Sequence, residues 1–555
     1  MVNITRSLKQ KRYLTLLWLI IPLSLSAFTH MWNPVGFPAF HVDESHYMRR
    51  AMQVMQGLGP QESMATYDYG YDHPYFGQIF LAAALSIVNY PYSINPSVSS
   101  QSIEMLYLVP RVLMGILAVV DTFLVYKIAD ARYNRKVAFI SATLFAVMPA
   151  SSLLRGIFLD SIALPFLLLS ILFAVYYAKS SGRVGSDHIN HDIKKLRYFL
   201  ILPSGIFLGL AIFTKLPVFA LIPLIIFILL NKNIINSNNN NKRTKSLDIR
   251  ALGVWLLPVV LIPLIWPGYA ISVGQFDSWI EGVIYQTARD SAGKDLRSSF
   301  VLVYDMDPIL LTLAAGAIIY SVIRKDYFIL LWALPFLVFL YFIGWVVPIH
   351  WIILVPILCI SAAMLIYNLI NAVSSRKLVK FLPHIAISVF VILGFLTTSL
   401  LIEKNLNILY LQLYLFIVQE LHQEDNTDNT STHMQNPDDD DGATTMIGSH
   451  RTRALVWIPL YVFKDSITFR ETDIPKDNFT KPLETKKFII VADSGLISRL
   501  TAIDQYERDR RVTQLYYNNS NTIATFIEKN LDKNYFFKID QNYGFGRFVD
   551  VRANY

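Results

Sequence analysis

The chain has 555 residues, of which 54% are hydrophobic and only 16% are charged. Soluble globular proteins are about 45–50% apolar and about 25% charged, so this composition excludes a soluble enzyme, a disordered protein and a coiled-coil rod. The net charge of +8 arises from Lys and Arg clustered in short loops between apolar runs. That pattern is typical of a polytopic membrane protein, and nucleic acid is not an expected partner.

Eleven apolar runs predict transmembrane helices. The first run, at 13–32, is long and lacks a small-residue cleavage site, which favours a retained span over a signal peptide. With the N-terminus in the cytoplasm, the Lys- and Arg-rich loops all fall on the inside, and three segments face outward: 33–106, 273–306 and the region from 403 onward. The remaining runs lie at 107–128, 137–154, 157–178, 198–214, 216–231, 251–272, 307–323, 326–345, 347–370 and 380–402.

The predicted fold is therefore mainly α-helical, with a transmembrane domain at 1–402. A short apolar stretch at 76–88 within the first outer loop is predicted to be interfacial or re-entrant, because it is too short to span comfortably. The acidic, polar stretch at 403–444 predicts a mobile linker. A small extracytoplasmic α/β domain is expected at 445–555, with strands at 454–463 and 486–493.

Charged residues at the outer ends of the spans are candidates for chemistry, because charge near a bilayer is costly. Asp43 and Glu44 precede residues with helical apolar spacing, which predicts an amphipathic helix on the outer surface. The pair either caps that helix or supplies a general base or cation ligand. Flanking histidines, His41 among them, make a metal site with Asp43 and Glu44 conceivable, with Mg²⁺ or Mn²⁺ as the candidate cofactor.

Asp72 and His73 stand just before the apolar stretch at 76–88. They either start a helix and face solvent or form part of a site. Arg111, at the outer end of the second span, either snorkels to the interface or holds a lipid phosphate.

Four more candidates lie at outward turns. Arg155 and Asp160 either pair with each other or belong to a site beside a long apolar run. Lys215 stands between two short apolar runs and either reaches water or binds an anion. His350 starts a late span, as a structural residue or as part of the site.

Together these features resemble the GT-C superfamily of integral-membrane glycosyltransferases, with protein O-mannosyltransferases and bacterial aminoarabinose transferases of lipid A as the nearest groups. The likeness covers about residues 13–370 and is carried by a fixed order of motifs. In chain order these are Asp43–Glu44, Asp72–His73–Pro74–Tyr75, Pro110–Arg111–Val112, Arg155 with Asp160, the segment GLAIFTK at 209–215, and His350 to Pro356. Tyr75 replaces a second proline of the family motif. The WWDYG motif of oligosaccharyltransferases is absent, which disfavours transfer of a whole oligosaccharide.

The resemblance implies transfer of one sugar from a polyprenyl (dolichyl or undecaprenyl) phosphate to a protein, glycan or lipid acceptor, on the outer face and with inversion. Asp43 would be the general base, and Glu44 would orient the acceptor or a cation. Arg111, Lys215, His350 and His73 would supply counter-charge to the phosphate. Asp160 would hold the donor sugar or orient a basic residue.

Two other functions compete with this interpretation. A transporter or flippase of lipid-linked sugars would also place charges in the membrane, although at the midplane and with inverted repeats. A non-catalytic scaffold would use the spans only as an anchor. The sequence favours a prokaryotic cell membrane over an endoplasmic reticulum, and it leaves the sugar and the acceptor open.

Overall fold

The computed structural model describes residues 18–60, 71–182, 191–230, 249–288, 295–373, 382–408, 411, 415, 444–448, 457–463, 467–471 and 487–491. The chain divides into two compact units. The first comprises Met1–Pro34, Asp68–Phe80 and Arg111–Lys404, and the second comprises Val35–Tyr67, Leu81–Pro110 and Asn405–Tyr555. Helices α3 (Phe76–Ile87) and α4 (Ser100–Arg132) are shared between them.

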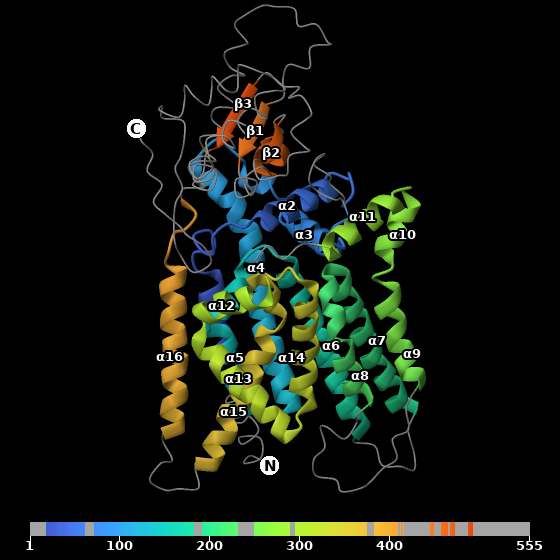
Figure 1. Cartoon of the computed structure of the whole chain (residues 1–555), viewed down its shortest axis with the longest axis vertical. Coiled ribbons are helices and arrows are strands. Elements are labelled where there is room, and N and C mark those ends of the chain that lie inside the picture. Colours follow the sequence, from blue (N-terminus) through green and yellow to red (C-terminus); the bar gives the residue numbers. More distant parts are fainter. Residues whose placement is uncertain are drawn as a thin grey trace, which may run out of the picture. The chain divides into compact units, whose positions relative to one another are not determined.

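The described part of the first unit consists of helices joined by short loops, and each apolar run predicted from the sequence contains a helix (Figure 1). Its elements are a helix at Trp18–Met31, α5 (Arg135–Val147), η2 (Pro149–Arg155), α6 (Leu159–Gly182), α7 (His191–Thr214), η3 (Leu216–Leu221), α8 (Ile222–Leu230), α9 (Ile249–Leu261), α10 (Ile265–Ser272), α11 (Phe276–Thr287), α12 (Leu296–Met306), α13 (Pro308–Arg324), α14 (Tyr327–Ile343), η4 (Pro348–Ile353), α15 (Val355–Val373) and α16 (Leu382–Ile402).

By length and composition, three described helices can each cross a membrane, and up to six spans result if each bent pair counts as one. The three helices are α4, α6 and α15. The bent pairs are α5 with η2, α9 with α10, and α12 with α13. Five further apolar helices have 10–17 residues. The chain is therefore a multi-pass membrane protein.

Helices of this unit pack with their backbones close to one another. Helix α6 packs along α7, and α7 packs along α9. A Cβ atom on Gly205 would overlap the carbonyl oxygen of Trp255, and one on Gly209 would lie 2.5 Å from that of Pro258. Small residues at such points let transmembrane helices gain van der Waals contact, so the glycine of GLAIFTK is explained by packing of α7 on α9.

Polar contacts join separate segments at each of the two ends of the bundle. At one end, Asp326 binds both Arg132 (Nη2 to Oδ1, 3.1 Å) and the hydroxyl of Tyr133, which donates to Oδ2 at 2.9 Å. These residues come from two loops that the sequence placed on the same side. At the opposite end, Asn33 donates to the carbonyl oxygens of Ile402 and Lys404, which also belong to segments predicted to share a side.

The second unit contains α2 (Val42–Met55), η1 (Tyr92–Ile94), a short helical stretch at 457–463 that includes η7 (Pro459–Phe463), and three strands. The strands are β1 (Thr444–Gly448), β2 (Ile467–Glu471) and β3 (Lys487–Val491). They form a parallel sheet of order β2-β1-β3, in which Thr444 is aligned with Ile467 and with Lys487.

Two expectations for this unit need correction. The strand predicted at 454–463 is wrong, because residues 457–463 are helical, whereas the strand predicted at 486–493 is confirmed by β3. Pro459 has no N–H to give to a β-ladder. The surface position predicted for the helix after Asp43 is also wrong, because residues 44–52 of α2 are buried on their polar and apolar sides alike. Most of the domain expected at 445–555 and of the linker at 403–444 lies outside the described residues.

Candidate active site

A buried ion pair joins two motifs of the first unit. Asp160 lies in the first turn of α6, where the helix dipole favours a carboxylate. Lys215 follows the last residue of α7, in extended conformation ahead of η3. Lys215 Nζ is 3.2 Å from Asp160 Oδ2, and the two side chains are only 5% and 2% exposed. The structure thus excludes a lysine that snorkels into water, and Asp160 pairs with Lys215 rather than with Arg155.

The segment that carries Asp72 and His73 leads into a helix that packs against the chain neighbours of this ion pair. Both residues are half-buried and lead into α3. A Cβ atom on Gly77, in the first turn of α3, would lie 2.5 Å from Leu159 Cδ2 and 2.9 Å from Thr214 Cγ2. Since Leu159 and Thr214 immediately precede Asp160 and Lys215, the start of α3 packs against the residues next to the pair in the sequence.

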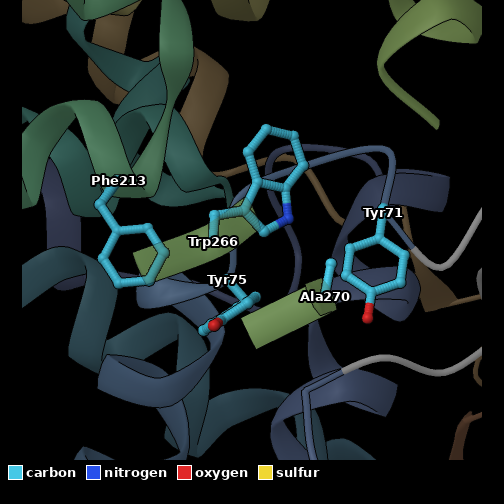
Figure 2. Packing of buried hydrophobic residues seen from close by; sticks show 5 residues of the cluster. All are labelled: Tyr71, Tyr75, Phe213, Trp266 and Ala270. Carbon is cyan, nitrogen blue, oxygen red and sulfur yellow. The ribbon is translucent and has the colours of Figure 1, made fainter. Parts of the chain in front are cut away.

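An aromatic cluster adjoins the same place (Figure 2). Tyr71, Tyr75, Phe213, Trp266 and Ala270 are buried together, and they come from the segment before α3, from α7 and from α10. Phe213 is two residues from Lys215 along α7. The cluster therefore packs the segment before α3 against α7 and α10.

Tyr75 connects the segment before α3 with α7 and α10. Its ring packs edge-on against Phe213 at 5.1 Å between centroids, and its hydroxyl donates to the carbonyl oxygen of Ile265 at 3.3 Å. Burial raises the pKa of Tyr75 above its usual value, so the hydroxyl stays protonated and remains a donor. This hydrogen bond thus links the segment before α3 to α10.

The outer loop predicted at 273–306 is largely helical in its described residues. Helix α11 packs so closely on the segment before α3 that a Cβ atom on Gly282 would lie 2.5 Å from the carbonyl oxygen of Tyr71. The Tyr71 hydroxyl donates to Gln275 Oε1 at 2.9 Å, at the start of the same helix. Contacts through α11 therefore fix the segment that carries Asp72 and His73.

Arg111 and Arg155 both bind the chain where the first helix ends. Arg155 donates to the carbonyl oxygens of Thr29, Trp32 and Asn33 at 2.5–2.9 Å. Arg111 donates to the carbonyl oxygen of Pro34 at 2.9 Å. Both side chains are fully buried, so Arg111 does not snorkel to the interface. Cations at a helix C-terminus also complement its dipole.

His350 and Asp307 stabilise helix starts in the first unit. His350 Nδ1 accepts from the backbone N–H of Val347 at 3.4 Å and so caps η4, which agrees with the structural alternative for this residue. Asp307 was not singled out from the sequence. It caps α13 through Leu310 N (3.0 Å) and also accepts from Ala150 N at 3.1 Å. The Asp-Pro pair at 307–308 is the sequence signal for such a cap.

Asp43 and Glu44 belong to the second unit, at the start of α2. Glu44 is buried, and its Oε2 accepts from the backbone N–H of His41 at 3.1 Å. His41 Nδ1 accepts in turn from Asp43 N at 3.2 Å, which completes a capping box. The Asp43 carboxylate is 3.6 Å from His41 Nδ1, and its side chain is 36% exposed.

This arrangement separates the functions of the two acids. Glu44 stabilises the helix start, while Asp43 presents a half-exposed carboxylate at the positive end of α2. Among the residues that the structure describes, no group of three or more His, Cys, Asp or Glu side chains is arranged to hold a metal ion.

Comparison with known proteins gives one family match. Residues 20–270 match the model of the dolichyl-phosphate-mannose-protein mannosyltransferase family, which is slightly less than half of the chain. No curated protein matches.

The archaeal oligosaccharyltransferase AglB from Archaeoglobus fulgidus, in complex with an inhibitory peptide and a dolichol-phosphate, has a similar structure. The TM-score is 0.51 at 12% identity, over 91% of this chain and 69% of AglB. ArnT from Cupriavidus metallidurans in the apo state gives a TM-score of 0.49 at 11% identity, over 94% of this chain and 92% of ArnT. The resemblance indicated by the sequence motifs is confirmed by the family match and by the AglB-like fold.

Proposed function

We propose that this chain is a GT-C glycosyltransferase, as its family match and fold support, and that it transfers one sugar from a polyprenyl phosphate to an outward-facing hydroxyl or amine. The observation that carries the proposal is the buried Asp160–Lys215 pair, whose chain neighbours Leu159 and Thr214 pack against the start of α3, the helix that follows Asp72 and His73. Asp160 was a candidate for the sugar and Lys215 for the phosphate, and their contact supports a common site.

The charge of a polyprenyl phosphate and its depth in the membrane support this donor. A polyprenyl phosphate has its tail in lipid and its phosphate at the interface, and its leaving group is already a stable anion. It therefore needs hydrogen-bond donors and counter-charge rather than a proton. A lysine ammonium has three donors, and one of them faces Asp160. The family that matches is named for dolichyl-phosphate-mannose, and AglB was solved with a dolichol-phosphate, which supports the same class of donor.

The acceptor is activated by Asp43 in this proposal. Its carboxylate accepts the acceptor's proton as the acceptor oxygen or nitrogen attacks the anomeric carbon, while the bond to the phosphate oxygen breaks. Attack from the face opposite the phosphate inverts the anomeric centre. Glu44 acts indirectly, through the capping box that sets the start of α2.

The remaining parts of the proposal concern topology. We infer eleven spans, with the N-terminus in the cytoplasm and the region from 445 to 555 outside as a small α/β domain. The parallel sheet of β1, β2 and β3 supports that domain class. The meeting of segments predicted to share a side, described above, supports the alternation of spans.

The proposal is tested with the full-length enzyme in lipid nanodiscs and a panel of polyprenyl-phosphate sugars, with the product identified by mass and its anomer by NMR. We expect Asp43→Asn to lower kcat by about 10²–10⁴-fold, the usual contribution of a positioned general base. Glu104→Gln, at an exposed acid of the same outer loop, is the matched control. Near-normal transfer by Asp43→Asn would remove Asp43 from the mechanism.

One observation favours transport of a lipid-linked sugar as a second candidate function. Asp121 is fully buried about two-thirds of the way along α4, and neither carboxylate oxygen has a hydrogen-bond partner in the described structure. Ionisable groups at the midplane are typical of transporters. Movement of donor across a liposome membrane without bond cleavage, abolished by Asp121→Asn, would support this function.

A further inference from the structure

Residues that follow the last span hold the segment leading into α2. Asn407 is fully buried and makes three hydrogen bonds to that segment. Its Nδ2 donates to the carbonyl oxygens of Val35 (2.6 Å) and Pro38 (2.8 Å), and its Oδ1 accepts from Phe40 N at 2.8 Å. Phe40 immediately precedes His41, the N-cap of α2.

A second contact reaches the same point from farther along the chain. Trp457 is fully buried, and its Nε1 donates to the hydroxyl of Tyr107 at 3.1 Å. The Tyr107 ring stacks on Phe40 with 4.0 Å between centroids, and it meets the Trp457 ring edge-on at 5.4 Å. Trp457 therefore packs, through one ring, against the residue beside the N-cap of α2.

A third contact holds the other end of the helix. The Gln53 side chain, in the last turn of α2, donates to the hydroxyl of Tyr461 at 3.0 Å. Tyr461 and Trp457 belong to the same helical stretch at 457–463. Both ends of the helix that begins beside Asp43 are thus bound by residues from the C-terminal part of the chain.

We propose that Asn407, Trp457 and Tyr461, here called the α2 clamp, are positioning residues that set the place of the Asp43 carboxylate. The C-terminal region is then part of the catalytic unit rather than an appended module. This inference rests on the proposed function, because it concerns the base of that reaction. A misplacement of about 1 Å at a reacting group can cost about 10²-fold in rate, so modest contacts of the clamp have a large effect on turnover.

The test is a double-mutant cycle on the hydrogen bond between Trp457 and Tyr107. Trp457→Phe and Tyr107→Phe each keep an aromatic ring and remove one partner of that bond. We expect each single variant and the double variant to lower kcat by the same factor, about threefold to tenfold, with the donor KM unchanged. Trp457→Ala, which also removes the ring, should lower kcat by about 10²-fold.

The matched control is Trp332→Phe. Trp332 is buried in α14 of the first unit and donates to the carbonyl oxygen of Ile353, so the same chemical change is made away from α2. Transfer by this variant should equal that of the unaltered enzyme.

A second measurement does not depend on activity. Hydrogen exchange of the backbone amides of residues 42–55 should rise at least tenfold in Trp457→Ala, with exchange in α6 and α7 unchanged. If the unaltered enzyme transfers no sugar, the proposed function fails, and exchange still decides whether the clamp holds α2. Unchanged exchange in α2, or normal kcat in Trp457→Ala, would overturn the inference, as would multiplicative effects of the two phenylalanine substitutions.

Discussion

Replacement of Lys215 by methionine tests whether the buried pair acts in function or only in folding. Methionine keeps most of the apolar volume and leaves Asp160 buried without its counter-charge. Removing one partner of a buried ion pair typically destabilises a protein by about 3–5 kcal/mol. The pair here falls in that class, because its atoms are 3.2 Å apart and both side chains are at most 5% exposed. We expect Lys215→Met to lose that amount and to lose sugar transfer.

The double variant Lys215→Met, Asp160→Leu separates the two explanations. It removes both charges, and a buried pair replaced by apolar residues of similar volume is often neutral or stabilising. We therefore expect its free energy of unfolding, followed by tryptophan fluorescence in mixed micelles, to return to within about 1 kcal/mol of the unaltered enzyme. Transfer should stay absent, because the counter-charge for phosphate is gone.

The outcomes that refute this reasoning are specific. A loss below about 1 kcal/mol in Lys215→Met would place the pair among solvent-screened surface pairs, contrary to its burial. Recovery of transfer in the double variant would show that the pair only stabilises the fold. Lys136→Met, at an exposed lysine at the start of α5, is the control and should stay within about 0.5 kcal/mol.

Two further predictions concern packing around the site. Gly282→Ala would bring a Cβ atom to 2.5 Å from the backbone oxygen of Tyr71, which cannot rotate away, so the melting temperature and the transfer rate should both fall. Gly316→Ala, whose added Cβ would meet only Leu365 Cδ2 at 3.6 Å, should change neither quantity, and equal behaviour of the two variants would contradict the packing of α11. Arg155→Lys keeps the charge but cannot reach three carbonyl oxygens, so the free energy of unfolding should fall by about 2 kcal/mol; an unchanged value would show that these hydrogen bonds do not stabilise the end of the first helix.

The segment GLAIFTK shows how much of the candidate site the local sequence pattern can predict. The sequence selected it by resemblance and placed it at the end of a span, but it did not reveal what each residue does. In the structure Gly209 allows close packing of α9, and Phe213 belongs to the aromatic cluster. Lys215 pairs with a carboxylate 55 residues away along the chain. Those partners depend on helix packing, which periodicity does not encode.

The incorrect predictions for α2 and for residues 454–463 arose because the local sequence pattern does not contain tertiary contacts. A helical pattern of Tyr47, Met48 and Ala51 predicted one buried face, and tertiary contacts of α2 bury the polar face as well. The apolar segment at 454–463 was read as a strand because short apolar runs do not distinguish strands from helices. The indole of Trp457 and its hydrogen bond to Tyr107 belong to a helical stretch instead.

By itself, the sequence determined that the chain is a helical membrane protein, where its helices lie, and which charged residues stand near the ends of the apolar runs. This was possible because a lipid environment forces each span to satisfy its backbone hydrogen bonds internally, so length and composition suffice. Only the tertiary structure decided which charges meet: Lys215 with Asp160, and the two arginines with the end of the first helix. Partner choice for a buried charge depends on what packing brings within about 4 Å, and that distance is set by contacts between segments remote in sequence.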